Sequence, residues 1–305
     1  MSDTRDWSKG AAWMRGEVVP IAKASIGITD WGVTRSDITY DVVPVWQGGF
    51  FRLEDYLDRF EASMVSLRLD VGMSRAEIRA ALHQMVGQSG LRDSYVAMVA
   101  SRGVPLIHGM RDPRQCANHF YAWCVPYVHV VKPEIATKGA SVWIAKEVRR
   151  IPEDSVNPRA KNYHWGDITQ GLFEAKDRGF ETVVLLDHDG NVTEGPGFNV
   201  FAVKDGRVVT PDRGVLHGIT RRTVLDICAE RGIATEARAL PLTELLEADE
   251  VFLSTSGGGA VPVTRVDDRI FSNDAPGPLA TGIRAAYWEW MERPGLRQEV
   301  DYAVH

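Results

Sequence analysis

The sequence predicts a mixed α/β protein of the α+β class, divided into two domains. Short runs rich in β-branched residues alternate with segments of helical periodicity along most of the chain. A chain of 305 residues is long enough for two hydrophobic cores of ordinary size. Residues 133–139 interrupt the alternation and are typical of a linker. We therefore expect one domain at residues 1–132, a linker at 133–139 and a second domain at 140–305.

The individual elements follow from periodicity and from turn residues. Strands are predicted where β-branched and aromatic residues cluster, at residues 39–46, 95–100, 120–131, 141–145, 182–186, 199–203, 208–210 and 251–254. Helices are predicted where apolar residues recur every three or four positions, at residues 53–69, 74–87, 166–178, 219–231 and 280–291. Ser74 followed by Glu77 forms a capping box for the second helix. Asp-Gly turns at 189–190 and 205–206 would fold the strands between 182 and 210 into a meander.

Charge and composition exclude several functional classes. The formal net charge is -6, and no run of Lys and Arg indicates a surface for nucleic acid or for an anionic membrane. No stretch reaches the roughly 18 apolar residues of a membrane span, and the N-terminus lacks the pattern of a signal peptide. The three cysteines form no CxxC pair, which favours a reducing compartment. We expect a cytoplasmic protein whose partners are small molecules.

Lys161 is the first candidate for chemistry. It lies in NPRAKNYHWGD (157–167), between a proline-bearing loop and the expected start of a helix. Aromatic neighbours and the nearby Arg159 would disfavour its ammonium form, and a neutral amine is what attack on a carbonyl requires. Within this segment alone, an ordinary solvated loop lysine is the simpler interpretation.

Glu194 is the second candidate. It lies in TEGPGFN (193–199), whose glycines would let a ligand approach the backbone closely. A carboxylate held there could keep a pyridinium nitrogen protonated and so strengthen the ring as an electron sink. The GPG sequence is also a good surface turn, so a plain turn glutamate is the alternative.

Two segments have the features of a phosphate site. Gly218, Ile219 and Thr220 open a predicted helix, whose first N–H groups and positive dipole end favour an anion. Thr255 and Ser256 begin TSGGG, which follows a strand and can curl its amides around an anion. Neither segment matches GxxxxGK[ST] or GxGxxG, so together they favour a monophosphate over a nucleotide. An ordinary helix cap and an ordinary turn are the alternatives.

Metal and hydrolase chemistry find no support in the sequence. The histidines lack HxxxH and HExxH spacing and no cysteine pairs with them, so we assign no metal. Ser256 does not lie in a GxSxG motif. Arg59 lies off the apolar face of its predicted helix, one turn after Asp55, and taken alone is expected to be a surface residue.

Taken together, these motifs resemble the class IV aminotransferases, which are fold-type IV pyridoxal-phosphate enzymes. The resemblance rests on EGPGFNVF (194–201), VVT (208–210) and LHGITR (216–221), in that order. The stretch TPDRGVL (210–216) is shorter than the loop usual in branched-chain aminotransferases and is similar to that of (R)-selective amine transaminases. The resemblance implies a smaller N-terminal α/β domain, a larger C-terminal β-barrel-like domain with helices, and a homodimer.

The resemblance also implies a role for each candidate residue. Lys161 would carry pyridoxal 5'-phosphate as a Schiff base and move a proton between substrate and cofactor. Glu194 would be the partner of the pyridine nitrogen, and Leu216 would pack on the cofactor ring. The phosphate would be held by Arg59, Ile219, Thr220, Thr255 and Ser256. The reaction implied is transfer of an amino group from a primary amine, an (R)-amine in that subfamily, to a keto acid such as pyruvate.

Substrate binding is implied at positions that match the pocket of the subfamily. These positions are Tyr40, Val42, Trp165 and Gly197, with Arg35 standing where many relatives have histidine. For the acceptor carboxylate, the loop 107–114 offers His108, Arg111 and Arg114, and an arginine makes the bidentate contact that imidazole cannot. The alternatives are a branched-chain or D-amino-acid aminotransferase, an aminodeoxychorismate lyase, and a non-catalytic cofactor-binding protein.

Overall fold

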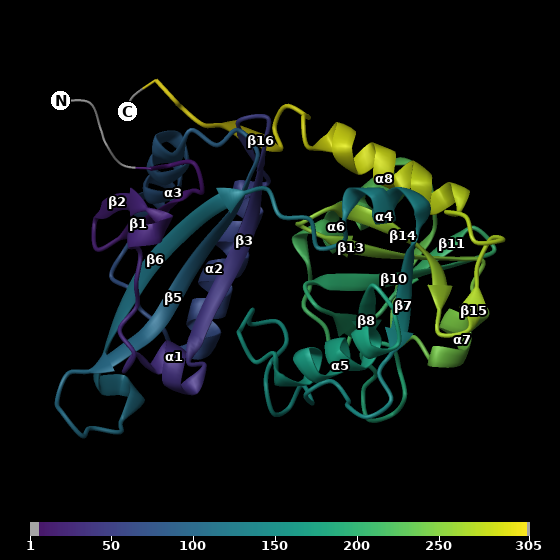
Figure 1. Ribbon diagram of the computed structural model, residues 1–305, viewed down its shortest axis with the longest axis horizontal. Coiled ribbons are helices and arrows are strands. Elements are labelled where there is room, and N and C mark those ends of the chain that lie inside the picture. The colour runs from purple at the N-terminus through teal and green to yellow at the C-terminus, as the bar shows by residue number, and fades with distance from the viewer. Residues whose placement is uncertain (1–5, 304–305) are drawn as a thin grey trace. The chain divides into compact units, whose positions relative to one another are not determined.

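Two compact units make up the protein in a computed structural model, which describes residues 6–303 (Figure 1). Among these residues, the first unit comprises 6–128, 160–163 and 292–303, and the second comprises 129–159 and 164–291. The segments 160–163 and 292–303 belong to the first unit although they follow parts of the second in sequence. The sequence pattern did not indicate these two returns, and the domain limits 1–132 and 140–305 stay a prediction.

The first unit is built on an antiparallel sheet with the strand order β16-β4-β3-β5-β6-β1-β2. Its strands are β1 (Ala11–Met14), β2 (Glu17–Pro20), β3 (Ile38–Trp46), β4 (Gly49–Phe51), β5 (Ser94–Pro105), β6 (Cys116–Pro126) and β16 (Arg297–Glu299). Its helices are η1 (Ile21–Lys23), α1 (Trp31–Arg35), α2 (Leu53–Leu67), α3 (Arg75–Ser89) and η2 (Pro113–Gln115). The long strands β3, β5 and β6 form the middle of this sheet (Figure 1).

Helices α2 and α3 form as the apolar spacing predicts. Tyr56, Leu57 and Phe60 of α2 are fully buried, and α2 packs against β3. The capping box of Ser74 and Glu77 at the start of α3 is confirmed, since the serine side chain and the glutamate side chain each bond the other's backbone N–H. The strand β5 extends further than the predicted 95–100, and β6 begins before the predicted 120 and ends before the predicted 131, because the two backbones pair from Ser94 with Pro126 to Pro105 with Cys116.

The second unit is built on a sheet with the order β12-β11-β10-β13-β14-β7-β8, to which β9 and β15 are attached. Its strands are β7 (Ala140–Ile144), β8 (Thr182–Val184), β9 (Glu194–Gly195), β10 (Phe198–Lys204), β11 (Arg207–Thr210), β12 (Thr235–Ala237), β13 (Glu250–Thr255), β14 (Gly259–Val266) and β15 (Arg269–Ile270). Its helices are α4 (Pro133–Lys138), α5 (Gly166–Asp177), α6 (Ile219–Glu230), α7 (Leu242–Leu246) and α8 (Pro278–Trp290).

The predicted meander forms around both Asp-Gly turns. After the turn at 189–190 the chain returns antiparallel, with Leu186 bridged to Val192, and β10 and β11 form the hairpin around the turn at 205–206. The sequence did not predict that β8 also pairs in parallel with β7, from which it is reached through α5, the kind of crossover that parallel strands require. Residues 133–138 of the predicted linker form the helix α4, since Pro133 suits a first helical turn and Gly139, at φ 100°, ends it.

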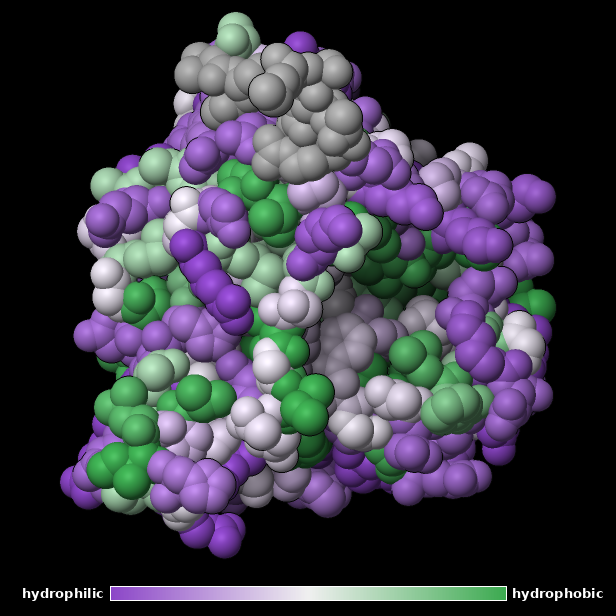
Figure 2. Space-filling model, turned by 60° about the vertical axis from the view of Figure 1, so that its left-hand side comes forward, coloured by the Kyte–Doolittle hydropathy of each residue, from purple (hydrophilic) through white to green (hydrophobic). Residues whose placement is uncertain are grey.

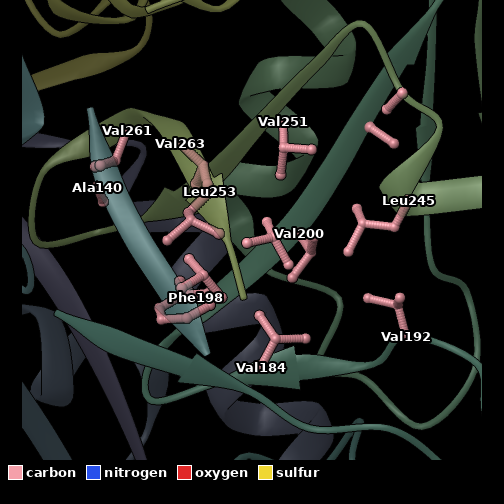
Figure 3. Packing of buried hydrophobic residues seen from close by; sticks show 14 of the residues in the cluster. Ala140, Val184, Val192, Phe198, Val200, Leu245, Val251, Leu253, Val261 and Val263 are labelled. Carbon is pink, nitrogen blue, oxygen red and sulfur yellow. The ribbon is translucent and has the colours of Figure 1, made fainter. Parts of the chain in front are cut away.

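The core of the second unit lies on both faces of its sheet. Val200 of β10 and Val251 and Leu253 of β13 point into one apolar cluster, which Figure 3 shows closely packed. The alternate residues Phe201 and Phe252 point to the other side, where α6 and α8 supply the apolar partners. This burial on both faces explains why the strands are nearly continuous hydrophobic runs.

Polar and apolar residues are interspersed on the surface of the protein. Figure 2 shows hydrophilic residues over much of one face, with apolar residues gathered in smaller groups between them. Within residues 6–303, no helix has the length and the apolar composition needed to cross a membrane.

Candidate functional site

Lys161 lies in a short segment of the first unit whose backbone is held against β3. The amide N–H of Lys161 donates to Ser63 Oγ at 3.3 Å. Its carbonyl oxygen accepts from Thr39 Oγ1 at 2.6 Å and from the Tyr40 amide at 3.2 Å. Asn162 forms a bridge to Thr39. The main chain of this lysine is therefore fixed on both sides, which an ordinary solvated loop would not require.

The side chain of Lys161 rests on an aromatic stack. Its Nζ lies 4.5 Å from the centroid of the Tyr40 ring, within range of a cation–π interaction. Tyr40 in turn stacks on Tyr163, with centroids 4.0 Å apart and planes 5° apart. Burial, followed by the Coulombic influence of Tyr40, raises the pKa of Tyr163, so this phenol stays neutral at physiological pH. The amine thus lies beside uncharged ring faces.

These rings belong to one apolar side of the first sheet, which we name the aromatic face. Because side chains alternate along a strand, the same side of β3, β5 and β6 collects every second residue. Its members are Tyr40, Val42, Tyr95, Tyr121 and Trp123, together with Tyr163. Burial raises the pKa of Tyr121 to about 12. The predicted pocket residues Tyr40 and Val42 therefore lie on one face, among aromatic neighbours that the sequence did not single out.

Arg59 was expected to be a surface residue, and this expectation is wrong. Its side chain is only 11% exposed, because α2 turns it toward β3, where the fully buried Asp41 accepts two hydrogen bonds from it. The distances are 2.8 Å from Nε and 2.6 Å from Nη2. Burial works against the charge of Arg59, but the Asp41 carboxylate outweighs it and raises the pKa of the guanidinium. Asp41 thereby fixes the orientation of this arginine.

Glu194 lies on the two-residue strand β9 of the second unit and is 7% exposed. Its Oε1 faces the guanidinium of Arg150, at 3.2 Å from Nε and from Nη2. Its Oε2 accepts a hydrogen bond from the amide of Leu216 at 2.9 Å. A carboxylate this buried has to be paired and hydrogen-bonded, and both of its oxygens meet that requirement. A plain surface glutamate is thus excluded.

Arg150 connects Glu194 to a second carboxylate. Its Nη1 donates to Asp167 Oδ2 at 2.7 Å, and the same oxygen accepts from the Ile151 amide at 2.8 Å. Burial disfavours the cation, but the charges of Glu194 and Asp167 prevail and raise the pKa of Arg150. The buried Arg150 guanidinium therefore lies between two carboxylates, that of Asp167 at the start of α5 and that of Glu194 on β9.

Leu216 is held by both of its backbone groups. Its amide donates to Glu194, and its carbonyl accepts from Asn199 Nδ2 at 2.8 Å. Gly218 follows, and a Cβ at this position would lie 2.3 Å from Asn199 Oδ1. Only glycine leaves room for this approach. The loop before α6 is therefore fixed to the strand that follows Glu194.

The predicted phosphate residues of the second unit meet at the start of α6. This helix begins at Ile219, directly after Gly218, an N-cap residue that has no side chain to bond the first N–H groups. Thr220 Oγ1 lies 3.5 Å from Ser256 Oγ, and Thr255 Oγ1 accepts from the Gly257 amide at 3.2 Å. The TSGGG segment is the turn that joins β13 to β14. The N-terminus of α6 and the hydroxyl groups of Thr220, Thr255 and Ser256 together form an arrangement suited to an anion.

The remaining candidates lie at exposed or loop positions. Arg35 is exposed at the end of α1, with its guanidinium carbon 3.4 Å from the centroid of the Trp31 ring. His108 and Arg111 are exposed in the loop between β5 and η2, where Arg114 pairs with Asp112 of the same loop. Trp165 precedes α5, and Gly197 lies in the turn between β9 and β10 with φ 76°.

Sequence reasoning missed the charged partners of the candidate residues. Arg150 contacts Glu194 and also pairs with Asp167, and Asp41 orients Arg59. Asp167 lies inside the segment 157–167 already singled out, and Asp41 lies between the predicted pocket residues Tyr40 and Val42, so an acid within an apolar run was the available signal. Arg150 lies in a polar stretch that carries no local signal, because its partner Glu194 is 44 residues away in sequence.

The described residues supply the groups that bound pyridoxal 5'-phosphate requires. Its aldehyde needs an amine, which Lys161 offers. Its ring nitrogen needs a buried carboxylate, and Glu194 is one. Its phosphate needs N–H and hydroxyl donors, which the start of α6 and the β13–β14 turn provide. The residues present therefore fit this cofactor.

Comparison with known proteins agrees with this chemistry. Residues 39–266 match the family model "Amino-transferase class IV". The chain is 29% identical over 280 residues to a D-alanine aminotransferase of Bacillus licheniformis, covering 89% of this chain and 93% of that protein. It is 28% identical over 287 residues to a provisionally named branched-chain-amino-acid aminotransferase of Methanocaldococcus jannaschii, covering 93% and 98%.

Solved structures agree as well. A T.th. branched-chain amino acid aminotransferase with pyridoxamine 5'-phosphate superposes with a TM-score of 0.89 at 25% identity, covering 96% of this chain and 99% of that one. The two-sheet architecture is thus that of the fold-type IV aminotransferases, as the sequence predicted. The chain belongs to the class IV aminotransferases and is a pyridoxal-phosphate-dependent transaminase.

Proposed function

We propose that this transaminase takes its amino group from a primary (R)-amine and delivers it to a keto acid such as pyruvate. The observation that carries the proposal is the aromatic face beside Lys161, where Tyr40, Val42 and Trp123 offer apolar surface to an amine without a carboxylate. The loop TPDRGVL, which resembles that of (R)-selective amine transaminases, supports the same donor class.

Each residue of the proposed site would have its own role in the reaction. When bound, the cofactor supplies an electron sink for the bond that is broken at the substrate carbon. Lys161 would hold the cofactor covalently and, once displaced by the amine donor, would take the proton from that carbon and deliver it as general acid to the C4' carbon of the cofactor. Glu194 would keep a proton on the ring nitrogen. Leu216 would pack on the ring, and the phosphate would be held by Arg59, Ile219, Thr220, Thr255 and Ser256.

The acceptor needs a cation for its carboxylate. We propose an arginine of the exposed loop between β5 and η2, with Arg111 preferred over His108 because a guanidinium makes a bidentate contact. Arg114 already pairs with Asp112. Trp165, Gly197 and Arg35 complete the proposed substrate positions. We further propose a cytoplasmic homodimer, in line with the resemblance to amine transaminases.

Turnover of matched donors tests the donor class. The purified enzyme with pyruvate should release acetophenone from (R)-1-phenylethylamine and not from the (S)-enantiomer. L-Leucine and D-alanine, each with 2-oxoglutarate, are the matched comparisons. Turnover of either amino acid without turnover of the (R)-amine would replace the proposal by a branched-chain or D-amino-acid aminotransferase.

Product analysis tests the remaining alternatives. A lyase releases pyruvate from aminodeoxychorismate without any amino acceptor, whereas a transaminase needs one. A yellow holoenzyme that turns over no amine or amino acid would indicate a cofactor-binding protein without catalysis. In the Lys161→Ala variant, any true transaminase activity should be lost together with covalent attachment of the cofactor.

A further inference from the structure

We infer that Arg150 is a positioning residue that keeps the Glu194 carboxylate ionised and oriented. The proton shared by this carboxylate and the ring nitrogen of the cofactor then stays on the nitrogen. The inference rests on the role proposed above for Glu194. It assigns to the reaction a residue whose described side-chain partners are Glu194 and Asp167, neither of which is a predicted substrate position.

The contacts of Arg150 fix the orientation of the carboxylate. Arg150 reaches Glu194 Oε1 from two of its nitrogens, both at 3.2 Å, while the Leu216 amide holds Oε2 at 2.9 Å. The two contacts act on different oxygens, so the carboxylate cannot turn without losing one of them. Both side chains are about nine-tenths buried. Water therefore has little access to replace either contact.

The charge of Arg150 decides where the shared proton lies. A carboxylate and a pyridine nitrogen that share one proton compete for it, and a guanidinium beside the carboxylate favours the anion. The proton is then held on the nitrogen. Arg150 would also repel a protonated ring, but Asp167, bonded to another nitrogen of the same guanidinium, offsets this repulsion. The Asp167–Arg150 pair is neutral overall and acts mainly on the carboxylate that it touches.

A direct readout is the protonation of the ring nitrogen. The holoenzyme is reconstituted with pyridoxal 5'-phosphate labelled with nitrogen-15 in its ring, and the nitrogen chemical shift is measured. We expect a protonated nitrogen in the wild type and in Arg150→Lys, and an unprotonated one in Arg150→Met. For the amine donor, kcat of Arg150→Met should fall on the order of 10- to 100-fold, as for other residues that orient a functional group, with a smaller change in KM.

The matched control is Arg102→Met. Arg102 belongs to the first unit, and its side chain is as buried as that of Arg150, with 9% exposed in each case. It pairs with Asp37 and donates to the carbonyl oxygens that end α2. This variant should lose stability through its broken ion pair while its ring nitrogen stays protonated.

The outcomes distinguish an error about Glu194 from an error about Arg150. If Glu194→Gln leaves the ring protonated and kcat unchanged, the role of Glu194 is wrong and this inference falls with it. If Glu194→Gln loses the proton but Arg150→Met keeps it, only the inference about Arg150 is overturned.

A second variant decides the matter if Arg150→Met yields no folded holoenzyme. In Arg150→Lys the positive charge remains, but the contact of two guanidinium nitrogens with Glu194 is lost. The ring nitrogen of the cofactor should therefore lose its proton at lower pH than in the wild type. The pH above which kcat declines should move down with it. An unchanged pH profile with an unchanged nitrogen shift would then overturn the inference.

Discussion

The surroundings of Lys161 and of Glu194 solve different physical problems. Lys161, in the first unit, is held by neutral groups: two hydroxyls, a backbone amide and the face of a tyrosine. Glu194, in the second unit, is held by a buried cation and an amide. The contacts described for Lys161 fix its backbone, so its main chain stays in place when, as proposed, the amine leaves the cofactor and returns to it. A carboxylate that has to stay charged needs a counter-charge on the side chain itself.

Removing the amine should have the largest effect. Lys161→Ala loses both covalent attachment and proton transfer, so kcat should fall on the order of 10,000-fold. Mass spectrometry after borohydride reduction should find the cofactor on the wild type and not on the variant. Lys146→Ala, which removes a partly exposed lysine bonded to Asp267, is the control and should keep the label. A labelled Lys161→Ala protein would show that another lysine carries the cofactor.

Neutralising the carboxylate should have the next largest effect. Glu194→Gln keeps the shape but removes the charge that Arg150 faces, so kcat should fall roughly 100- to 1,000-fold, as when a site loses one preorganised polar group. Steady-state kinetics measure this. Glu174→Gln changes another buried glutamate of the same unit, one that accepts from the Lys146 and Glu147 amides. Equal losses in both variants would mean that burial, and not the position of the charge, explains the effect.

Crowding the loop before α6 should have an intermediate effect. In Gly218→Ala the new Cβ would lie 2.3 Å from Asn199 Oδ1 and push Asn199 away from Leu216. Overpacking of this kind costs about 1–3 kcal/mol, and affinity for the cofactor should weaken with it. Denaturant unfolding measures the loss of stability, and cofactor titration measures the loss of affinity. Gly166→Ala, where nothing lies within 4 Å of the new Cβ, should change neither.

Loosening the backbone of Lys161 should have the smallest effect. Thr39→Val removes the hydroxyl that donates to the Lys161 carbonyl at 2.6 Å, at a cost of about 1 kcal/mol in the free energy of unfolding. Activity should fall a few-fold with it, because the amine is aimed less well. Thr281→Val removes a comparable side-chain bond within α8 and should lower stability alone. Unaltered kcat in Thr39→Val would show that this bond does not position the amine.

The local elements of this protein were readable from its sequence because their causes are local. The capping box at Ser74, the start of α6 after Gly218 and the hairpin of β10 and β11 each depend on residues a few positions apart. The family could be recognised for the same reason, since its motifs are short and occur in a fixed order. Glu194 was found inside one of those motifs, and Lys161 in the segment 157–167.

Tertiary structure decided whatever depends on partners distant in sequence. Arg150 meets Glu194 across 44 residues, Arg59 meets Asp41 across 18, and Thr39 meets Lys161 across 122. Periodicity misassigned Arg59 because it records which side of a helix is apolar, not which buried acid lies opposite. The parallel pairing of β7 with β8 escaped prediction for a similar reason. The sequence by itself predicted which groups react, and the fold decided which charges and hydroxyls hold them, because pairing energies depend on distance in space.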